Sequence, residues 1–340
     1  MKTKLLCTLG PASLDAGVIA ALDERQVDLF RVNLSHTPLG DLKRTIEFIQ
    51  QHTATPICID TEGAQVRCGT MWPDVLLTAG DPIELTATEV VGSGEELTLR
   101  PRSVFRELEV GSVASIDFDC ARIRITEVAQ GRARAVVLEA GRIGSNKAVT
   151  VVPSPRLPAL TEYDVKAIKI ALRYGITHFA LSFASHANDV ARLRALLPPG
   201  AHVIAKIESR AGVRSIDGIA DRADAVLIDR GDLSREVAIE YVPACQKHII
   251  QRANARSTPV FVATNLLESM LVNRTPTLAE ANDIINTLGD GAQGLVLAAE
   301  TAIGKHPVES VDVVRRLAQA FSESAAEPVP GQSLGSLIAV

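Results

Sequence analysis

The sequence predicts an α/β fold, a (β/α)8 (TIM) barrel with a small β-barrel-like lid domain inserted after the third strand. Eight short apolar runs recur along the chain, and all but the third are followed by a stretch with helical spacing. The third run opens instead into a region of short strand-like segments. The eight runs begin near Lys4, Val27, Pro56, Thr177, His202, Asp224, Pro259 and Gln293.

Capping residues mark several of the predicted helices between these runs. Ser13 is expected to cap the first helix, and Gly175 is expected to end the helix that precedes the fourth run. Thr277 and Glu280 have the spacing of a capping box, in which each side chain bonds a backbone N–H of the other residue. These signals predict helices that alternate with the strands.

The inserted region begins after Gly69, where short apolar runs are broken by Gly and Asp, and the chain returns to the barrel near Val152. We assign residues 1–69 and 153–326 to the barrel, 70–152 to the inserted domain and 327–340 to a loosely ordered tail. An insertion at this point overhangs the barrel mouth, which suits a mobile lid. The predicted strands of the insertion are Val75 to Leu77, Ile83 to Ala87, Val113 to Ile116, Ile123 to Val128 and Ala133 to Leu138.

Composition narrows the class of protein. The chain has 340 residues, is 46% hydrophobic and carries a formal charge of -5, so it has no basic field to hold nucleic acid or an anionic membrane. The five cysteines show no CxxC spacing and lie mostly in apolar runs, as in a reducing compartment. No apolar stretch has the form of a signal peptide or of a membrane span. We expect a soluble cytoplasmic protein.

Polar and charged residues stand at the ends of the apolar runs. The carboxyl ends of barrel strands face one common mouth, where catalysis occurs in such folds, so these side chains should converge. A mixture of cations, carboxylates and hydroxyls suits an anionic, phosphorylated substrate held with a divalent metal. The residues are Arg31, Asn33, Ser35, Asp60, Thr61, Arg67, Ser182, Lys206, Glu208, Arg230, Asp232, Thr264 and Glu300.

Lys206 and Glu208 are two residues apart on one strand and therefore point to the same side. At the mouth of the barrel, a lysine can neutralise a phosphoryl group and a carboxylate can bind a metal. The simpler alternative is that Lys206 and Glu208 form an ordinary salt bridge. Asp232 ends the next strand and supplies a second carboxylate, which favours a Mg2+ or Mn2+ site. Gly231 allows close approach of the backbone and can present N–H groups to a substrate carboxylate, or is a plain turn glycine.

The neighbouring strand ends supply compact oxygen ligands at Asn33, Ser35, Asp60 and Thr61. Oxygen donors without Cys or His disfavour zinc and suit a hard cation. The alternative is that Asn33, Ser35 and Thr61 satisfy backbone groups of loops. Thr264 can relay a proton through water or can be structural.

Several motifs in order resemble the signatures of the pyruvate kinase family, and the likeness runs from Lys4 to about Glu323. The motifs are Cys7-Thr-Leu-Gly-Pro-Ala-Ser13, Arg31-Val-Asn-Leu-Ser-His36, Asp60-Thr-Glu-Gly, Lys206-Ile-Glu208, Arg230-Gly-Asp-Leu233, Ala263-Thr-Asn-Leu-Leu-Glu-Ser-Met270 and Ala299-Glu-Thr-Ala302.

The resemblance implies transfer of the phosphoryl group of phosphoenolpyruvate to ADP, through a metal-stabilised enolate that is protonated to pyruvate. It implies catalytic roles for Lys206, Arg31 and Thr264, and a Mg2+ or Mn2+ site at Glu208 and Asp232. The resemblance also implies phosphate contacts from Arg31 and Arg67. It implies a K+ site formed by Asn33, Ser35, Asp60 and Thr61. The implied nucleotide contacts are Thr8, Pro11, His36 and Lys147. With the strand-end residues Ser182, Arg230, Gly231 and Asp232, these complete the candidate site.

The sequence also departs from the family pattern. Glu62 stands where the family has lysine, Gln65 replaces a residue associated with the K+ requirement, and Asp229 replaces alanine. These changes lower the positive charge on the nucleotide side. The sequence also ends after the eighth barrel helix, so we expect no further α/β domain and no sugar-phosphate regulation through one.

Three functions fit these residues. The first is a pyruvate kinase; the second is a metal-dependent lyase or aldolase that acts on pyruvate, phosphoenolpyruvate or a related 2-oxo acid without ADP. The third is a non-catalytic protein that binds such a metabolite, since one fold supports several chemistries. Barrel-to-barrel contacts would make the chain a homodimer.

Overall fold

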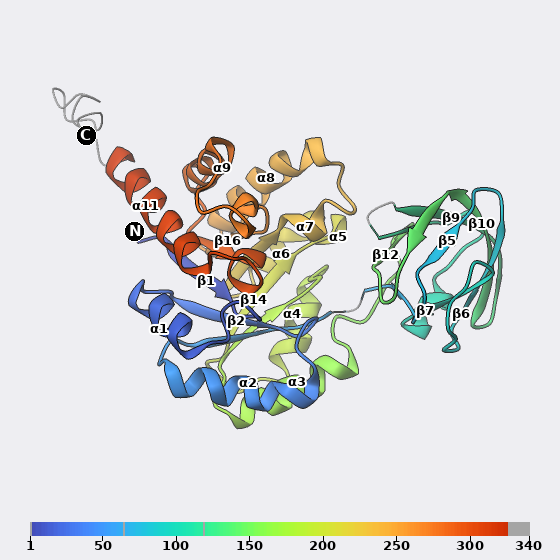
Figure 1. The fold of residues 1–340 in the computed structure, drawn as a ribbon, viewed down its shortest axis with the longest axis horizontal. Helices are drawn as coiled ribbons and strands as arrows, with labels where there is room; N and C mark the ends of the chain where they lie inside the picture. Colours follow the sequence, from blue (N-terminus) through green and yellow to red (C-terminus); the bar gives the residue numbers. More distant parts are fainter. Residues whose placement is uncertain (1, 64, 118–119, 326–340) are drawn as a thin grey trace.

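The computed structural model describes residues 2–63, 65–117 and 120–325, and the tail predicted at 327–340 lies outside them. A closed barrel of eight parallel strands forms the larger part of the molecule, as predicted (Figure 1). Around the barrel the strand order is β1-β17-β16-β15-β14-β13-β3-β2. The strands are β1 (Lys4–Thr8), β2 (Leu29–Asn33), β3 (Ile57–Asp60), β13 (His178–Leu181), β14 (His202–Ile207), β15 (Ala225–Asp229), β16 (Val260–Ala263) and β17 (Gly294–Leu297).

Helices connect the strands around the outside of the barrel. The capping box of Thr277 and Glu280 is confirmed at the start of α9, and Gly175 follows the end of α3 at a φ of +71°. The prediction for Ser13 is wrong, because Asp15 caps α1 and the Ser13 hydroxyl instead accepts a bond from the Gly10 N–H. The helices are α1 (Ala16–Glu24), α2 (Leu39–His52), α3 (Glu162–Arg173), α4 (Ala187–Arg194), α5 (Arg210–Arg214), α6 (Ile216–Ala220), α7 (Arg230–Leu233), α8 (Val242–Asn254), α9 (Leu278–Gly289), α10 (Ala299–Ala302) and α11 (Pro307–Ala325), with 3-10 turns η2 (Ile239–Tyr241) and η3 (Glu268–Leu271).

A second, β-rich region stands beside the barrel and is joined to it by two chain segments (Figure 1). Its main sheet has the order β12-β8-β9-β10-β6-β7-β4, and a two-stranded sheet pairs β11 with β5. The elements are β4 (Arg67–Cys68), β5 (Val75–Leu77), β6 (Pro82–Thr86), β7 (Glu96–Arg100), η1 (Arg102–Arg106), β8 (Val113–Ile116), β9 (Ala121–Ala129), β10 (Arg132–Glu139), β11 (Gly141–Ile143) and β12 (Val149–Val152).

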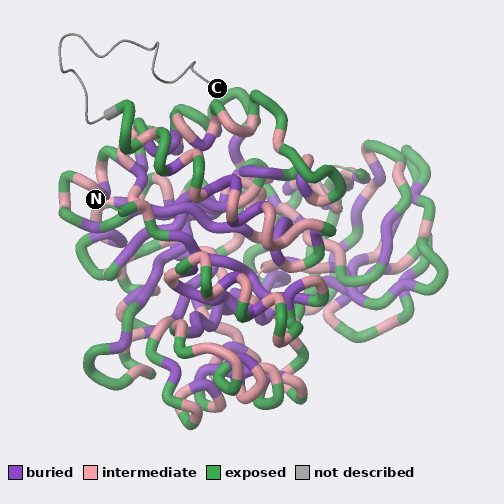
Figure 2. Tube along the Cα trace, turned by 60° about the vertical axis from the view of Figure 1, so that its left-hand side comes forward, coloured by how far each residue is buried: buried purple, intermediate pink, exposed green. Residues whose placement is uncertain are grey.

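The two regions have separate apolar cores. The barrel strands run through the buried centre of the larger region, as Figure 2 shows, because helices cover their outer faces and side chains such as Leu227 and Phe261 fill the interior. Another cluster, which includes Ile83, Leu97 and Ile123, fills the β-rich region. Each region therefore buries its own apolar surface.

Asp164 anchors the segment that leaves the barrel for the β-rich region. Its buried carboxylate accepts hydrogen bonds from the backbone N–H groups of Glu62 (2.8 Å), Gly63 (3.3 Å) and Thr161 (2.9 Å). Gly63 has a φ of +71°, and an added Cβ would lie 2.9 Å from the Cβ of Ser182. One acidic side chain thus fixes the path of both connections.

None of the helices within residues 2–63, 65–117 and 120–325 combines the length and apolar character that a membrane crossing needs.

Candidate active site

Strand register brings a set of charged side chains together at the carboxyl ends of the barrel strands. Asn33 on β2 pairs with Asp60 on β3, Asp60 pairs with Ala180 on β13, and Lys206 lies on β14 beside Leu227 of β15. Lys206 and Asp60 are both almost fully buried. Burial of so many charges is costly unless they are paired, so their pairing decides what the site can do.

Lys206 lies at the centre of this network. Its ammonium Nζ is 2.8 Å from Oε1 of Glu208, 3.2 Å from Oδ2 of Asp60 and 3.7 Å from Oδ2 of Asp229. Nζ also donates to the Ser182 hydroxyl at 3.1 Å. Burial opposes the charge, but Asp60 and Glu208 outweigh it and raise the pKa of Lys206. The site therefore holds a fixed positive charge.

Arg31 supplies the second buried cation. Its guanidinium lies 2.6 Å from Oδ2 of Asp60 and donates to the Thr8 hydroxyl at 3.1 Å. Burial tends to raise the pKa of Asp60, but the charges of Arg31 and Lys206 prevail and lower it. Asp60 is thus an ionised carboxylate that joins the two cations.

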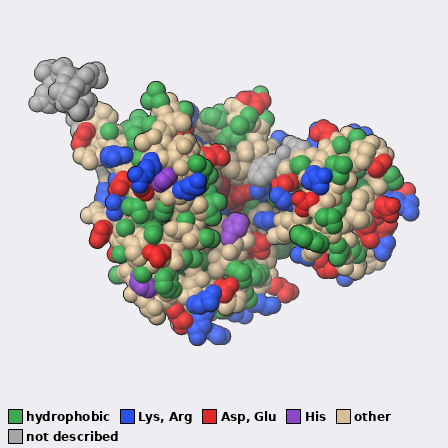
Figure 3. All heavy atoms as spheres, viewed as in Figure 1, with side chains coloured by type: hydrophobic (Ala, Val, Ile, Leu, Met, Phe, Trp, Pro, Cys, Tyr) green, Lys and Arg blue, Asp and Glu red, His purple; other side chains and the backbone are tan. Residues whose placement is uncertain are grey.

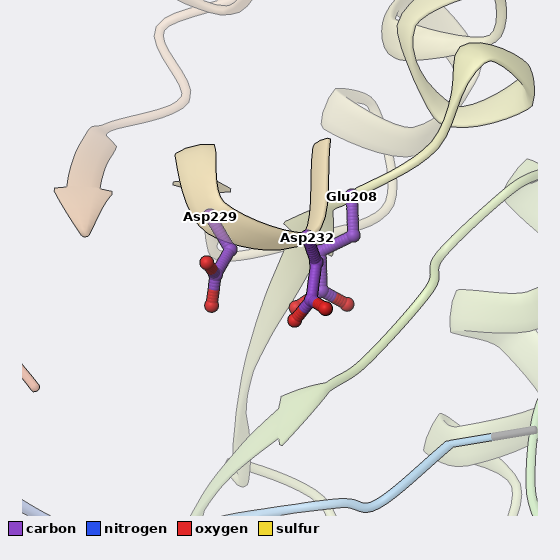
Figure 4. Close-up of side chains that lie close together, drawn as sticks. All are labelled: Glu208, Asp229 and Asp232. Atoms are coloured by element: carbon purple, nitrogen blue, oxygen red, sulfur yellow. The ribbon is translucent and has the colours of Figure 1, made fainter. Parts of the chain in front are cut away.

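Three carboxylates form a cluster next to Lys206. Glu208, Asp229 and Asp232 each offer an oxygen, and these oxygens lie within 4.8 Å of one another. Figure 4 shows the three carboxylates on the same side of the α7 ribbon. Burial raises the pKa of Glu208 to about 8, and burial with the charge of Asp229 raises the pKa of Asp232. We call these three residues the carboxylate cluster.

Asp229 is the member of the cluster that sequence reasoning missed as a ligand, since it was interpreted only as a departure from the family. The signal was present, however. Ala225 and Leu227 pack inside the barrel, and alternate residues on a strand share a face, so Asp229 faces inward as well.

The cluster fits a hard divalent cation. Oε1 of Glu208 is buried and accepts no hydrogen bond from the described residues, although Lys206 lies at ion-pair distance. Donors that are all carboxylate oxygens suit Mg2+ or Mn2+ rather than a soft metal. Asp232 is also paired with Arg235 at 3.0 Å, so a cation would compete with that contact.

Thr264 and its neighbours make an ordered turn beside the cluster. The Thr264 hydroxyl accepts from the N–H of Gly231 at 2.8 Å and lies 3.2 Å from Oδ1 of Asp229. Thr264 itself has a φ of 68°, which is unusual for a β-branched residue. The guanidinium of Arg230 is engaged with the Thr264 carbonyl and with Asp283. In this structure Arg230 therefore connects the turn at Thr264 to helix α9.

The side chains predicted to hold K+ bond their surroundings in this structure. The side-chain oxygen of Asn33 accepts from the Ser35 N–H at 3.0 Å, and the Thr61 hydroxyl accepts from the Ser182 N–H at 2.9 Å. The Ser182 hydroxyl donates to the Thr61 carbonyl at 2.7 Å. These are the backbone contacts of the alternative interpretation, and the K+ site stays a prediction.

The residues predicted for the nucleotide are spread over both regions. Thr8 is buried against Arg31, Pro11 and His36 are exposed, and Lys147 lies in the β-rich region, where it pairs with Asp117 at 2.8 Å. Thr8, Pro11 and His36 thus belong to the barrel and Lys147 to the β-rich region.

Arg67 lies at the border of the two regions. Its guanidinium donates to the Asn146 carbonyl at 3.0 Å and to the Gln65 side chain at 3.1 Å, and it lies 3.9 Å from Glu62. Its Nε is buried without a hydrogen-bond partner among the described residues. The pKa of Glu62 is raised, mainly because its carboxyl group is partly buried. The nearest carboxylate to this Nε, that of Glu62, lies beyond hydrogen-bond distance.

Glu300 has a structural role. Its buried carboxylate accepts from the N–H groups of Leu267 (3.1 Å) and Ala298 (2.8 Å), which ties two loops together. Its position at a strand end did not reveal this, because the sequence does not show where loop N–H groups point.

Acidic and basic side chains are visible in the recess between the barrel and the β-rich region (Figure 3). A small hollow of about 110 Å³ at Thr264 and Glu268 adjoins the carboxylate cluster. A larger hollow at Pro56 and Gly175 lies at the amino ends of the strands. Because function in this fold resides at the carboxyl ends, we place the candidate active site in the mouth.

Comparisons with known proteins point to one family. The family model described as the barrel domain of pyruvate kinase matches residues 1–311. A pyruvate kinase of Sporosarcina psychrophila is 34% identical over 330 residues, which cover 93% of this chain and 56% of that protein. A pyruvate kinase of Thermococcus litoralis is 32% identical over 333 residues, which cover 95% of this chain and 70% of that protein.

A crystal structure of a pyruvate kinase from Cryptosporidium parvum superposes with a TM-score of 0.85 at 27% identity, covering 96% of this chain and 73% of that one. The chain spans just over half the length of several curated relatives. The family model and these relatives cover the barrel, the inserted region and the charged strand ends, and the chain therefore belongs to the pyruvate kinase family.

Proposed function

We propose that the chain transfers the phosphoryl group of phosphoenolpyruvate to ADP and forms pyruvate and ATP. The observation that carries this proposal is the position of Lys206, a buried ammonium group held between Asp60 and the carboxylate cluster. A fixed cation in a water-poor site stabilises the charge of a transferring phosphoryl group without reorganisation. Family membership supports the same reaction.

Arg31 and Lys206 would bind the phosphoryl oxygens from two sides, and Asp60 would keep the two cations in place. Arg67 would bind the substrate at the rim through its unpartnered Nε. A Mg2+ or Mn2+ ion held by Glu208 and Asp232 would add positive charge for the substrate oxygens. Orienting the substrate in this way is itself a large part of catalysis.

The proton that the enolate accepts would be held near Thr264. The carboxylate of the substrate would lie near Gly231. The Thr264 hydroxyl is 3.2 Å from Asp229, so it can hold and pass a proton through a water molecule. The backbone at Gly231 would approach the substrate carboxylate closely. Ser182 would keep Lys206 in position, because its hydroxyl accepts from Nζ at 3.1 Å.

Further parts of the proposal concern the surroundings of the site. We propose K+ at Asn33, Ser35, Asp60 and Thr61, residues 70–152 as a lid, and nucleotide contacts from Thr8, Pro11, His36 and Lys147. We also propose a cytoplasmic homodimer, which light scattering tests through the mass in solution.

The test is turnover with Mg2+, K+, phosphoenolpyruvate and ADP, with pyruvate and ATP measured separately. The expected result is equal amounts of both products, from wild type and not from Lys206→Met. The absence of both products under every metal and salt condition would contradict the proposal. Formation of pyruvate without ATP would mean that the chain catalyses a reaction that does not use ADP.

One observation favours such a reaction as the second candidate. The carboxylate cluster and Lys206 are assembled, whereas Lys147 is paired with Asp117 and His36 is exposed. A metal-dependent lyase or aldolase would need only the first group of residues. Exchange of deuterium into the methyl group of pyruvate, with metal and without nucleotide, would identify it if no ATP forms from phosphoenolpyruvate and ADP.

A further inference from the structure

Asp229 gives the site one carboxylate more than the proposed metal site at Glu208 and Asp232 requires. It is 4% exposed and ends β15, and its Oδ2 lies 3.7 Å from Nζ of Lys206. No step of the proposed reaction uses this carboxylate as a ligand. Its burial beside two other acids needs a physical account, because like charges so close repel each other.

Ionised Glu208 would leave the strand ends with an excess of negative charge. Asp60, Glu208 and Asp229 are the buried carboxylates within ion-pair distance of Arg31 or Lys206. With all three ionised, the buried acids exceed these two buried cations, and a divalent cation would balance them. Asp232 adds a fourth carboxylate and is shared with Arg235 nearer the solvent.

The position of Glu208 indicates where a cation would sit. Oε1 of Glu208, in a residue that is 1% exposed, lies 2.8 Å from Nζ of Lys206 and accepts no hydrogen bond from any other described group. The ligand oxygens of Glu208, Asp229 and Asp232 lie within 4.8 Å of one another (Figure 4). A carboxylate oxygen has more than one lone pair, so an ion bound by the three oxygens would use acceptor capacity that Lys206 leaves free.

We propose that Asp229 is the third carboxylate ligand of a divalent cation, and that this site binds the ion in the absence of substrate. The inference deepens the proposed function and rests on it only for the place of the metal. Protein sites with one or two carboxylates rely on substrate oxygens to hold Mg2+, whereas additional charged ligands tighten cation binding. The third carboxylate also makes the loaded site one charge more negative, so an anionic substrate gains less from it.

The test uses Mn2+ alone and then oxalate, a dianion that resembles the enolate of pyruvate, with wild type and Asp229→Asn. We expect Asp229→Asn to weaken Mn2+ binding by about tenfold or more, measured by electron paramagnetic resonance. At saturating Mn2+ the same variant should bind oxalate about tenfold more tightly, because a negative charge beside the anion is gone. The two affinities thus change in opposite directions.

Asp290→Asn is the matched control, because Asp290 pairs with Lys247 on the surface, outside the cluster. It should bind Mn2+ and oxalate as wild type does. A Mn2+ affinity of Asp229→Asn within about twofold of wild type, or oxalate binding that does not tighten, overturns the inference. Circular dichroism establishes that each variant is folded. Neither measurement uses ADP or turnover, so a chain without kinase activity can still pass this test.

Discussion

The two sides of the mouth differ in how their charges are held. On one side, Lys206 and the carboxylate cluster come from the adjacent strands β14 and β15 and the short helix α7, and they contact one another directly. On the other side, the predicted nucleotide contacts lie at the end of β1, on two loops and in the β-rich region, where Lys147 pairs with Asp117. The barrel alone thus assembles the proposed metal site, whereas the proposed nucleotide contacts come from both regions.

Replacement of Lys206 by methionine should have the largest effect. Turnover should fall by about 10²–10³ or more, because a preorganised charge is lost. The metal-free protein should lose about 3–5 kcal/mol of stability, since the buried carboxylates of Asp60 and Asp229 lose a cation that faces them. Urea unfolding with and without Mn2+ measures this, and the ion should restore part of the loss.

Lys247→Met is the control for this change. Lys247 is an exposed lysine paired with Asp290, and its loss should cost less than about 1 kcal/mol. Equal losses of stability in Lys206→Met and Lys247→Met would show that the buried network stabilises the fold no more than a surface ion pair does.

Asp164→Ala should disturb the nucleotide side and leave the metal side intact. The variant leaves the N–H groups of Glu62, Gly63 and Thr161 without their acceptor, at a cost of about 2–4 kcal/mol. Binding of Mn2+ should stay close to wild type, while KM for ADP rises. Asp189→Ala, which removes a capping contact of α4, is the control and should cost about 1 kcal/mol. Loss of Mn2+ binding in folded Asp164→Ala would mean that the two sides are not separate.

The metal side should also respond to pH. The pKa of Glu208 is raised to about 8, so its contribution to folding is present below pH 4.5 and is lost as the pH rises through about 8. The stability of metal-free wild type relative to Glu208→Gln should therefore fall over that range. Mn2+ binding should strengthen over the same range, because the ion needs the ionised carboxylate. A difference in stability that does not change with pH would contradict the buried, protonated Glu208.

Glu62→Gln should have the smallest effect. The carboxylate lies 3.9 Å from the guanidinium of Arg67, and both side chains are partly exposed, so the pair is worth about 0.2–1 kcal/mol. Releasing Arg67 should lower KM for phosphoenolpyruvate by about fivefold at most. Steady-state kinetics measures this change, and a higher KM would mean that Glu62 orients Arg67 instead.

Much of the fold was predictable because it rests on local patterns. The starts of all eight barrel strands lie within a few residues of their predicted positions, since buried parallel strands are continuous apolar runs between helices. Strands β4, β7, β11 and β12 were missed, because short strands of a small sheet carry little signal by themselves. Ser13 resembles a helix cap, but Asp15, two residues later, has the geometry to bond the first N–H groups of α1.

The sequence predicted which residues belong to the site better than it predicted the contacts of those residues. Strand ends identified Lys206, Glu208 and Asp232, because the barrel fixes which ends converge. The sequence could not show that Arg230 binds Asp283, or that Glu300 binds loop N–H groups, since those partners come from distant segments. Asp229 was predictable from strand alternation alone.

The most direct test of the central claim follows the methyl protons of pyruvate in deuterated water by NMR, with Mn2+ or Mg2+ and with or without ADP. If Lys206 and the carboxylate cluster stabilise an enolate, wild type should exchange these protons with metal present, and Glu208→Gln should not. Exchange that is equally fast without metal, or equally fast in Glu208→Gln, would contradict the account.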